Sequence, residues 1–129
     1  IGLLTGSLMP AQAYYKVQKL RELVRRQVLG ALENCDVLVL PTSRSCAPLS
    51  QDDPTITSKD MAARMPPVMT RPFNLAGAPA LSVNCGFNSQ GLPIGLQIGG
   101  RPFAEETVLK VAHAYEQNTD WHNRRPPTI

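Results

Sequence analysis

The sequence has 129 residues, of which 43% are apolar, so it fits one compact domain or part of a larger one and disorder over most of it is excluded. Its net charge of +3 lies mainly in the first helix and at Arg124 and Arg125, without the interleaved aromatic residues of a nucleic-acid surface, so we expect no nucleic-acid partner. No basic leader precedes an apolar segment and no apolar run reaches the about 20 residues of a membrane span, so we expect a cytoplasmic protein without a membrane partner.

The chain opens without a methionine, inside the apolar run Ile1-Gly2-Leu3-Leu4. Complete domains usually begin in polar, frayed segments. We therefore interpret Ile1 as a truncation point in a longer protein.

Residues 11–32 predict an amphipathic helix, because apolar side chains recur there every three or four residues. This stripe consists of Tyr14, Val17, Leu20, Val24, Val28 and Leu32. Arg21 falls inside the stripe, where a charge must be paired or must border water. Two interpretations stay open for Arg21: a structural ion pair or snorkelling side chain, which we favour, and a cation that faces a pocket.

Residues 36–41 form a short β-branched run closed by a proline, which predicts a central strand covered on both faces. Ligands of open α/β sheets gather at the carboxyl ends of such strands. Pro41, Thr42 and Ser43 therefore lie where a pocket rim would be, although a simple strand-ending turn explains them equally well.

The middle of the chain predicts a polar surface loop at residues 43–54 and a short helix at residues 58–65. Another short helix is predicted within residues 70–79. Gly77 suits its left-handed C-cap, and Pro79 prevents the helix from continuing.

Residues 80–85 and 92–99 predict two strands, which a turn at residues 86–91 would join into an antiparallel hairpin. Three glycines lie in or beside the second strand. Gly95, Gly99 and Gly100 suggest a close approach of the backbone to its neighbours, or a bulge.

Residues 104–119 predict the last helix, with Glu105 and Glu106 in its first turn at the positive end of the helix dipole. Its apolar stripe consists of Ala104, Val108, Val111, Ala112 and Tyr115. We expect residues 121–129 to run along the surface as a tail.

No complete catalytic constellation can be assembled from these residues. Ser82 lies in a predicted strand rather than in the Gly-x-Ser-x-Gly turn of a nucleophile elbow. Nothing in the sequence places Cys85 beside His113, and Asp52 and Asp53 belong to a polar loop that is typical of a solvated surface.

The cysteines and histidines indicate neither a disulfide framework nor a metal site. Cys35, Cys46 and Cys85 are odd in number and widely spaced, which is typical of reduced thiols. His113 and His122 lack ligand-type neighbours at metal spacing. We expect no metal and no cofactor.

Several segments, taken together, resemble the end of the amidase signature family. They are Asn74-Leu-Ala-Gly-Ala-Pro-Ala-Leu-Ser82, Gly91-Leu-Pro-Ile-Gly-Leu-Gln-Ile-Gly-Gly100 and the helix end Ala112-His-Ala-Tyr-Glu116, preceded by similar segments at residues 14–21 and 36–42. The resemblance implies an α/β chain that forms an incomplete part of an α/β/α fold around a mixed sheet. Residues 1–129 would be the C-terminal segment of a single amidase domain.

The resemblance implies an amide hydrolase that uses a serine nucleophile, a second serine and a lysine, all of which precede the segments matched here. Lys16, Lys19, Lys59 and Lys110 do not correspond to that lysine. Since the reacting groups must converge within hydrogen-bond distance, we expect no catalytic residue in this chain and no activity from it alone. The implied partners are a small amide substrate and the missing N-terminal part of the same enzyme, and a homo-oligomer stays open.

The strand end at Pro41 and Thr42, together with Met69 and Thr70 in the region of the resemblance, suggests a pocket lining. Met65, Val68 and Met69 would suit an apolar acyl pocket, although helix packing explains methionines at least as often.

Two alternatives to a general amidase are kept. The first is the glutaminase-type A subunit of a tRNA-dependent amidotransferase, in which an acidic residue helps to hold the glutamine amino group. Our alignment places Pro66 or Pro67 at that position, and neither side chain can bind an ammonium, which favours a less polar substrate. The second alternative is a non-catalytic binding or assembly module with the amidase shape.

Overall fold

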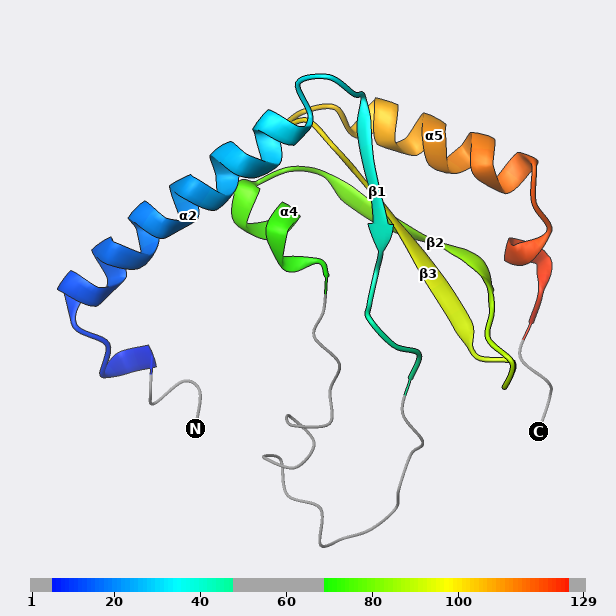
Figure 1. The fold of residues 1–129 in the computed structure, drawn as a ribbon, viewed down its shortest axis with the longest axis horizontal. Coiled ribbons are helices and arrows are strands. Elements are labelled where there is room, and N and C mark those ends of the chain that lie inside the picture. Colours follow the sequence, from blue (N-terminus) through cyan, green and yellow to red (C-terminus); the bar gives the residue numbers. More distant parts are fainter. Residues whose placement is uncertain (1–5, 48–68, 126–129) are drawn as a thin grey trace, which may run out of the picture.

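The computed structural model describes residues 6–47 and 69–125. Its elements follow the chain in the order α2 (Ala11–Ala31), β1 (Val37–Pro41), α4 (Arg71–Ala76), β2 (Ala80–Phe87), β3 (Pro93–Gly100), α5 (Glu105–Gln117) and the 3-10 helix η1 (Trp121–Asn123) (Figure 1). The predicted helices and strands that fall within these ranges are confirmed, with bounds that shift by a few residues. The predicted helix at residues 58–65 and the greater part of the loop at residues 43–54 lie outside the described residues.

The described strands form a three-stranded antiparallel sheet in the order β1-β3-β2. The prediction of a central strand for residues 36–41 is wrong for this chain, because β1 lies at the edge of the sheet. Helix α5 packs on β2 and β3, and Val39 of β1 stays 51% exposed. An apolar run shows that a strand can be covered on both faces, but it cannot show that the covering elements belong to the same chain.

The predicted antiparallel hairpin is confirmed, with β2 two residues longer than expected. A register shift between Asn84 and Gly86 marks a bulge in β2 rather than in β3. The turn is fixed by Asn88, whose side-chain oxygen accepts bonds from the backbone N–H groups of Gln90 and Leu92, each at 2.9 Å. This local network holds the hairpin end in one conformation.

Helices lie on both faces of β3, and glycines make this possible. A Cβ atom on Gly99 would stand 2.1 Å from the ring of Phe73 in α4, and one on Gly100 would stand 2.5 Å from Val108 in α5. Successive strand residues face opposite sides of a sheet, so α4 and α5 contact opposite faces. The predicted close approach at these glycines is confirmed.

The core lies between the sheet and α5. Ile98, Val108 and Ala112 are buried together, and partly buried residues surround them: Val37, Leu81, Val83 and Val111. This cluster confirms the predicted stripe of the last helix. On the other face, Phe73 and Ala76 of α4 are buried, and Gly77 ends α4 at φ 65°, which confirms the predicted left-handed cap.

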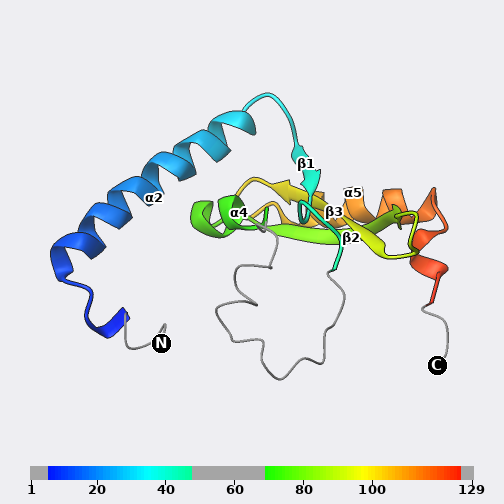
Figure 2. The ribbon, with the colours of Figure 1, turned by 60° about the horizontal axis from the view of Figure 1, so that its bottom comes forward.

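No residue of helix α2 is buried, although Val24, Val28 and Leu29 near its C-terminal end are half-buried. Leu32, directly after it, is fully buried, whereas Tyr14, Val17 and Leu20 of the predicted stripe are at least half exposed. Figures 1 and 2 show α2 running away from the sheet as an arm. Within the described part of the chain, no helix is long and apolar enough to cross a membrane.

Helix α2 packs against α4, and two arginine side chains add hydrogen bonds at this helix and at the residues that follow it. Arg21 Nε donates to the carbonyl of Leu75 in α4 at 2.9 Å. Arg101 Nε donates to the carbonyl of Leu32 and its Nη2 to that of Cys35, each at 3.1 Å, so a cation satisfies carbonyls at the end of α2. Arg21 thus has a structural bond, made to a carbonyl rather than to the carboxylate of an ion pair.

Candidate functional site

A cavity of about 510 Å³ opens where β1 ends and β3 begins. Its lining includes Pro41, Thr42 and Met69 of the four pocket residues proposed from the sequence, and also Ser43, which was placed at the strand end. Thr70 is half-buried beside Met69 and is not part of the lining. The other lining residues are Arg44, Ser45, Cys46, Ala47, Pro93, Ile94 and Gly95. The carboxyl end of β1 is therefore a cavity rim, as its sequence suggested, although a role in substrate binding stays a prediction.

Backbone hydrogen bonds hold this rim together. The N–H of Thr42 donates to the carbonyl of Gly95 at 2.9 Å, which extends the β1–β3 pairing one residue past Pro41. The N–H of Met69 donates to the carbonyl of Thr42 at 3.2 Å. Thr42 thereby joins the start of β3 to the segment that enters α4.

A hydroxyl pair lies next to the cavity. The Oγ1 atom of Thr42 and the Oγ atom of Ser82 are 2.5 Å apart, a short hydrogen bond that joins the residue after β1 to β2 across β3. A Cβ atom on Gly95 would stand 2.8 Å from both hydroxyl oxygens. The bare backbone of Gly95 is therefore what allows the two side chains to meet above β3.

Gln97 is a polar residue of this region that the sequence analysis did not single out. It is 4% exposed, and its Oε1 atom is a buried acceptor without a hydrogen-bond partner among the described residues. Gln97 pairs with Ser82 across the sheet and lies two residues from Gly95, so it shares the face that carries the hydroxyl pair. Gln97 lies between Gly95 and Gly99, which both face neighbouring side chains at close range. A glutamine between two glycines of the same strand face was the signal in the sequence that could have identified this residue.

The described residues bring no serine and lysine together. The Ser82 hydroxyl meets another hydroxyl instead of a base. Lys16 and Lys19 are exposed on α2, and Lys110 pairs with Glu106 at 2.6 Å on the exposed side of α5. This arrangement can shape and hydrogen-bond a ligand, but it offers no activated nucleophile within the described part of the chain.

The Cys85 and His113 pair considered from the sequence does not form. The Cys85 thiol donates to the carbonyl of Ile94 at 3.4 Å, and His113 is exposed on α5. Cys35, Cys46 and Cys85 are free thiols in this structure. Several other residues considered from the sequence lie outside the described ranges, namely Asp52, Asp53, Lys59, Met65, Pro66, Pro67 and Val68.

Comparison with known proteins gives a consistent result. A family model described as Amidase matches residues 3–109. The chain is 45% identical over 127 residues to the A subunit of the glutamyl-tRNA(Gln) amidotransferase of Microcystis aeruginosa, and 50% identical over 118 residues to that of a Synechococcus strain. These matches cover 98% and 89% of this chain but 26% and 22% of the relatives, so the chain spans about a quarter of their length.

Solved structures agree with the sequence comparison. A bacterial aryl acylamidase of the amidase signature family superposes with a TM-score of 0.75 at 26% identity, over 95% of this chain and 27% of the other. The A subunit of the glutamyl-tRNA(Gln) amidotransferase of Thermotoga maritima gives 0.65 at 31% identity, over 91% and 26%. These neighbours confirm the expected fold class, an incomplete part of an amidase-signature α/β fold.

The expectation that no nucleic acid is involved finds no support in these comparisons. The curated relatives carry the name of a glutamyl-tRNA(Gln) amidotransferase, so a tRNA belongs to the chemistry for which they are named.

Proposed function

Because this chain belongs to the amidase family, we propose that the protein that contains it hydrolyses a carboxylic amide to the acid and ammonia. The match of the family model across residues 3–109 is the single observation that carries this proposal. In it, the described residues form one wall of the substrate cavity.

The cavity at the end of β1 supports this role. Met69, Pro93 and Ile94 give it an apolar side suited to an acyl group, while Thr42 and the exposed Arg44 offer hydrogen-bond donors at its rim. We assign Pro41, Thr42, Met69 and Thr70 to this substrate wall. Thr70 does not line the cavity itself and would act by positioning its neighbour Met69.

The chemistry itself is assigned to residues outside this chain. Within the described ranges, the Ser82 hydroxyl has only the hydroxyl of Thr42 as its hydrogen-bond partner, and no lysine contacts it. A serine that lacks a base is a weak nucleophile. The catalytic serines and lysine of the family would therefore come from the upstream part of the protein, and this chain alone would be inactive.

The test is ammonia release by the full-length protein from a panel of aliphatic and aromatic amides, with the 129-residue chain as the matched control. We expect release from the full-length protein and none from the chain. A full-length protein that contains the upstream serines and lysine yet releases no ammonia from any amide would contradict the proposal. Absence of those upstream residues would favour the non-catalytic module instead.

A second candidate is the A subunit of an amidotransferase that takes ammonia from glutamine. It is favoured by the identity of 45% and 50% to relatives that bear this name, against 26% to the aryl acylamidase. The prolines at positions 66 and 67 argue against an acidic contact to the glutamine amino group. Release of ammonia from free glutamine, increased by partner subunits and glutamyl-tRNA, would establish this candidate, whereas release from simple amides alone would exclude it.

Location and assembly belong to the same proposal. A cytoplasmic site fits both candidates, and the homo-oligomeric state is a separate question that light scattering of the full-length protein would answer.

A further inference from the structure

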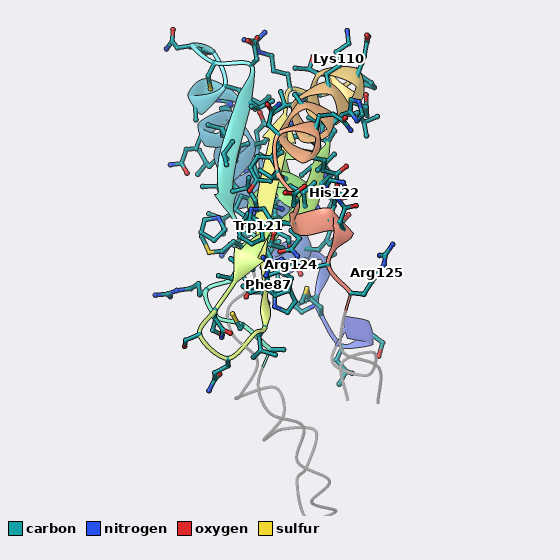
Figure 3. All side chains as sticks on the ribbon, turned by 90° about the vertical axis from the view of Figure 1, so that its right-hand side faces the viewer. Phe87, Lys110, Trp121, His122, Arg124 and Arg125 are labelled. Carbon is teal, nitrogen blue, oxygen red and sulfur yellow. The ribbon has the colours of Figure 1, made fainter. Side chains whose placement is uncertain are left out.

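A second hollow, which shares no lining residue with the cavity at the end of β1, lies between the hairpin end and residues 121–125. Its volume is about 570 Å³, and it is lined by Phe87, Asn88, Ser89, Gly91, Trp121, Arg124 and Arg125. Figure 3 shows Phe87, Trp121 and Arg124 gathered at this place, with Arg125 following on the tail. We call Phe87, Trp121, Arg124 and Arg125 the arginine-aromatic surface.

Aromatic rings hold the central cation of this surface in position. The guanidinium carbon of Arg124 lies 5.0 Å from the ring centroid of Trp121 and 5.5 Å from that of Phe87. The two rings are themselves 6.2 Å apart and inclined by 58°. Cation–π attraction from two rings restricts a side chain that would otherwise sample many rotamers, and it leaves the N–H edge of the guanidinium free.

Among the described residues, no carboxylate compensates the positive charge of this surface. Neither Arg124 nor Arg125 has a carboxylate within 4.0 Å in the described ranges, where the ion pairs are Arg26–Glu22 and Lys110–Glu106. The lining of the hollow contains two arginines and no aspartate or glutamate. A fixed guanidinium fork with free donors is suited to a bidentate oxyanion.

The composition favours a protein carboxylate over a nucleic acid. The centres of protein interfaces are enriched in aromatic residues and arginine and depleted in acidic residues and lysine, as here. A phosphate backbone is bound through many cations, each of which neutralises one phosphate, whereas the lining of this hollow offers two adjacent arginines, and Asp120 borders the neighbouring hollow together with Arg124. Arg124 also lies over one face of each ring, so that face is not open for base stacking.

We infer that the arginine-aromatic surface binds an acidic segment of a partner protein, with the Arg124 fork on a carboxylate and Arg125 as a supporting charge. Phe87 and Trp121 act as positioning residues, because they fix the guanidinium and contact the apolar part of the partner segment. This inference is independent of the proposed amide hydrolysis, since none of its residues lines the cavity at the end of β1.

The test uses the full-length protein and fluorescence anisotropy with labelled short peptides that carry adjacent glutamates beside an apolar residue. The same peptides with glutamine in place of glutamate, and a single-stranded RNA of mixed sequence, are the comparison probes. We expect the acidic peptides to bind, and Arg124→Gln and Arg124→Lys each to weaken binding about tenfold, because lysine keeps the charge but loses the fork. Trp121→Leu should also weaken binding although it removes no charge.

The matched control is Arg26→Gln, which removes an exposed arginine from α2 and should leave binding unchanged. Thermal midpoints of all variants are compared first, and Arg124→Lys, which keeps the charge on an exposed residue, serves where Arg124→Gln alters folding. Equal binding of glutamate and glutamine peptides, absence of peptide binding, or equal losses in Arg26→Gln and Arg124→Gln would overturn the inference. Arg124-dependent binding of the RNA in place of the acidic peptides would overturn it as well and would identify a nucleic-acid site.

Discussion

The hairpin region and helix α2 differ in how far their apolar side chains are buried. Around the hairpin, α4 and α5 cover β3 from both faces and bury Phe73, Ile98 and Val108 to 2% exposure or less. Along α2, the stripe is buried only near Leu32, while Leu20 is 60% exposed. The hairpin region thus has a buried core, whereas α2 keeps an apolar face that the described residues leave exposed.

The way in which α2 is attached differs in kind as well. Arg21 of α2 donates to Leu75 in α4, and Arg101 donates to Leu32 and Cys35 in the segment that follows α2. Directional bonds to carbonyls fix the position of a helix without burying its stripe. The comparison teaches that an amphipathic pattern predicts a helix and its apolar face, but not where the covering surface comes from.

Removal of the largest buried side chain of the hairpin region should cause the largest loss of stability. Phe73→Ala should lower the free energy of unfolding by about 3–5 kcal/mol, because the ring is 1% exposed and its loss leaves a cavity against β3. Urea denaturation followed by circular dichroism measures the change. A loss below about 1 kcal/mol would show that α4 does not belong to the core.

Adding a methyl group at the same contact should have the next largest effect. Gly99→Ala would place a Cβ atom 2.1 Å from the Phe73 ring, and we expect a loss of about 1–3 kcal/mol from overpacking. Gly30→Ala in α2 is the matched control, since nothing lies within 4 Å of its Cβ position. It should stabilise the chain by about 0.5–1 kcal/mol, and equal losses at both glycines would contradict the comparison.

Removal of the hydroxyl pair should have a smaller effect on the free energy of unfolding, and its main effect should be on substrate binding at the cavity. Ser82→Ala removes the partner of Thr42, and we expect a loss of about 0.5–1.5 kcal/mol in unfolding free energy. In the full-length protein, KM for an amide substrate should rise because the Thr42 hydroxyl at the cavity rim loses the partner that fixes its orientation, while the backbone bonds of the rim remain. Ser89→Ala, on the exposed hairpin end, should change neither quantity, and an equal KM effect from it would count against a role for the pair.

The smallest effect on stability is expected on the exposed stripe of α2. Leu20→Lys should change the unfolding free energy by less than about 0.5 kcal/mol, because the side chain is 60% exposed. The same change should reduce self-association of the isolated chain, measured by light scattering, because it interrupts an uncovered apolar face. A loss comparable to that of Phe73→Ala would mean that this face is already packed.

Local patterns predicted much of the fold. The helical periodicity predicted α2 and α5, and the Gly77-x-Pro79 sequence predicted the end of α4. Two strand-like runs separated by a turn at residues 86–91 predicted the hairpin. These signals were sufficient because each depends on neighbours within a few residues. The glycines of β3 predicted close contact, although not the partners Phe73 and Val108, which come from other segments.

Contacts between distant segments could not be predicted. The edge position of β1 depends on which strands the chain supplies, and the Thr42–Ser82 bond depends on the register of two strands against β3. Likewise, the sequence shows an arginine pair in the tail without interleaved aromatic residues. The structure places Phe87 and Trp121 beside Arg124, and Phe87 comes from a strand far earlier in the chain.

The two glycines at the end of β3 affect how a displacement would pass from one face of the sheet to the other. At Gly99 and Gly100 the ring of Phe73 and the side chain of Val108 rest almost directly on the backbone, from opposite sides. A side chain can accommodate the displacement of a neighbour by changing its rotamer. A backbone that is hydrogen-bonded to strands on both sides cannot move as easily. A displacement of α4, whose entering segment borders the cavity, would therefore be transmitted through the thickness of a single strand to α5 instead of being absorbed in between.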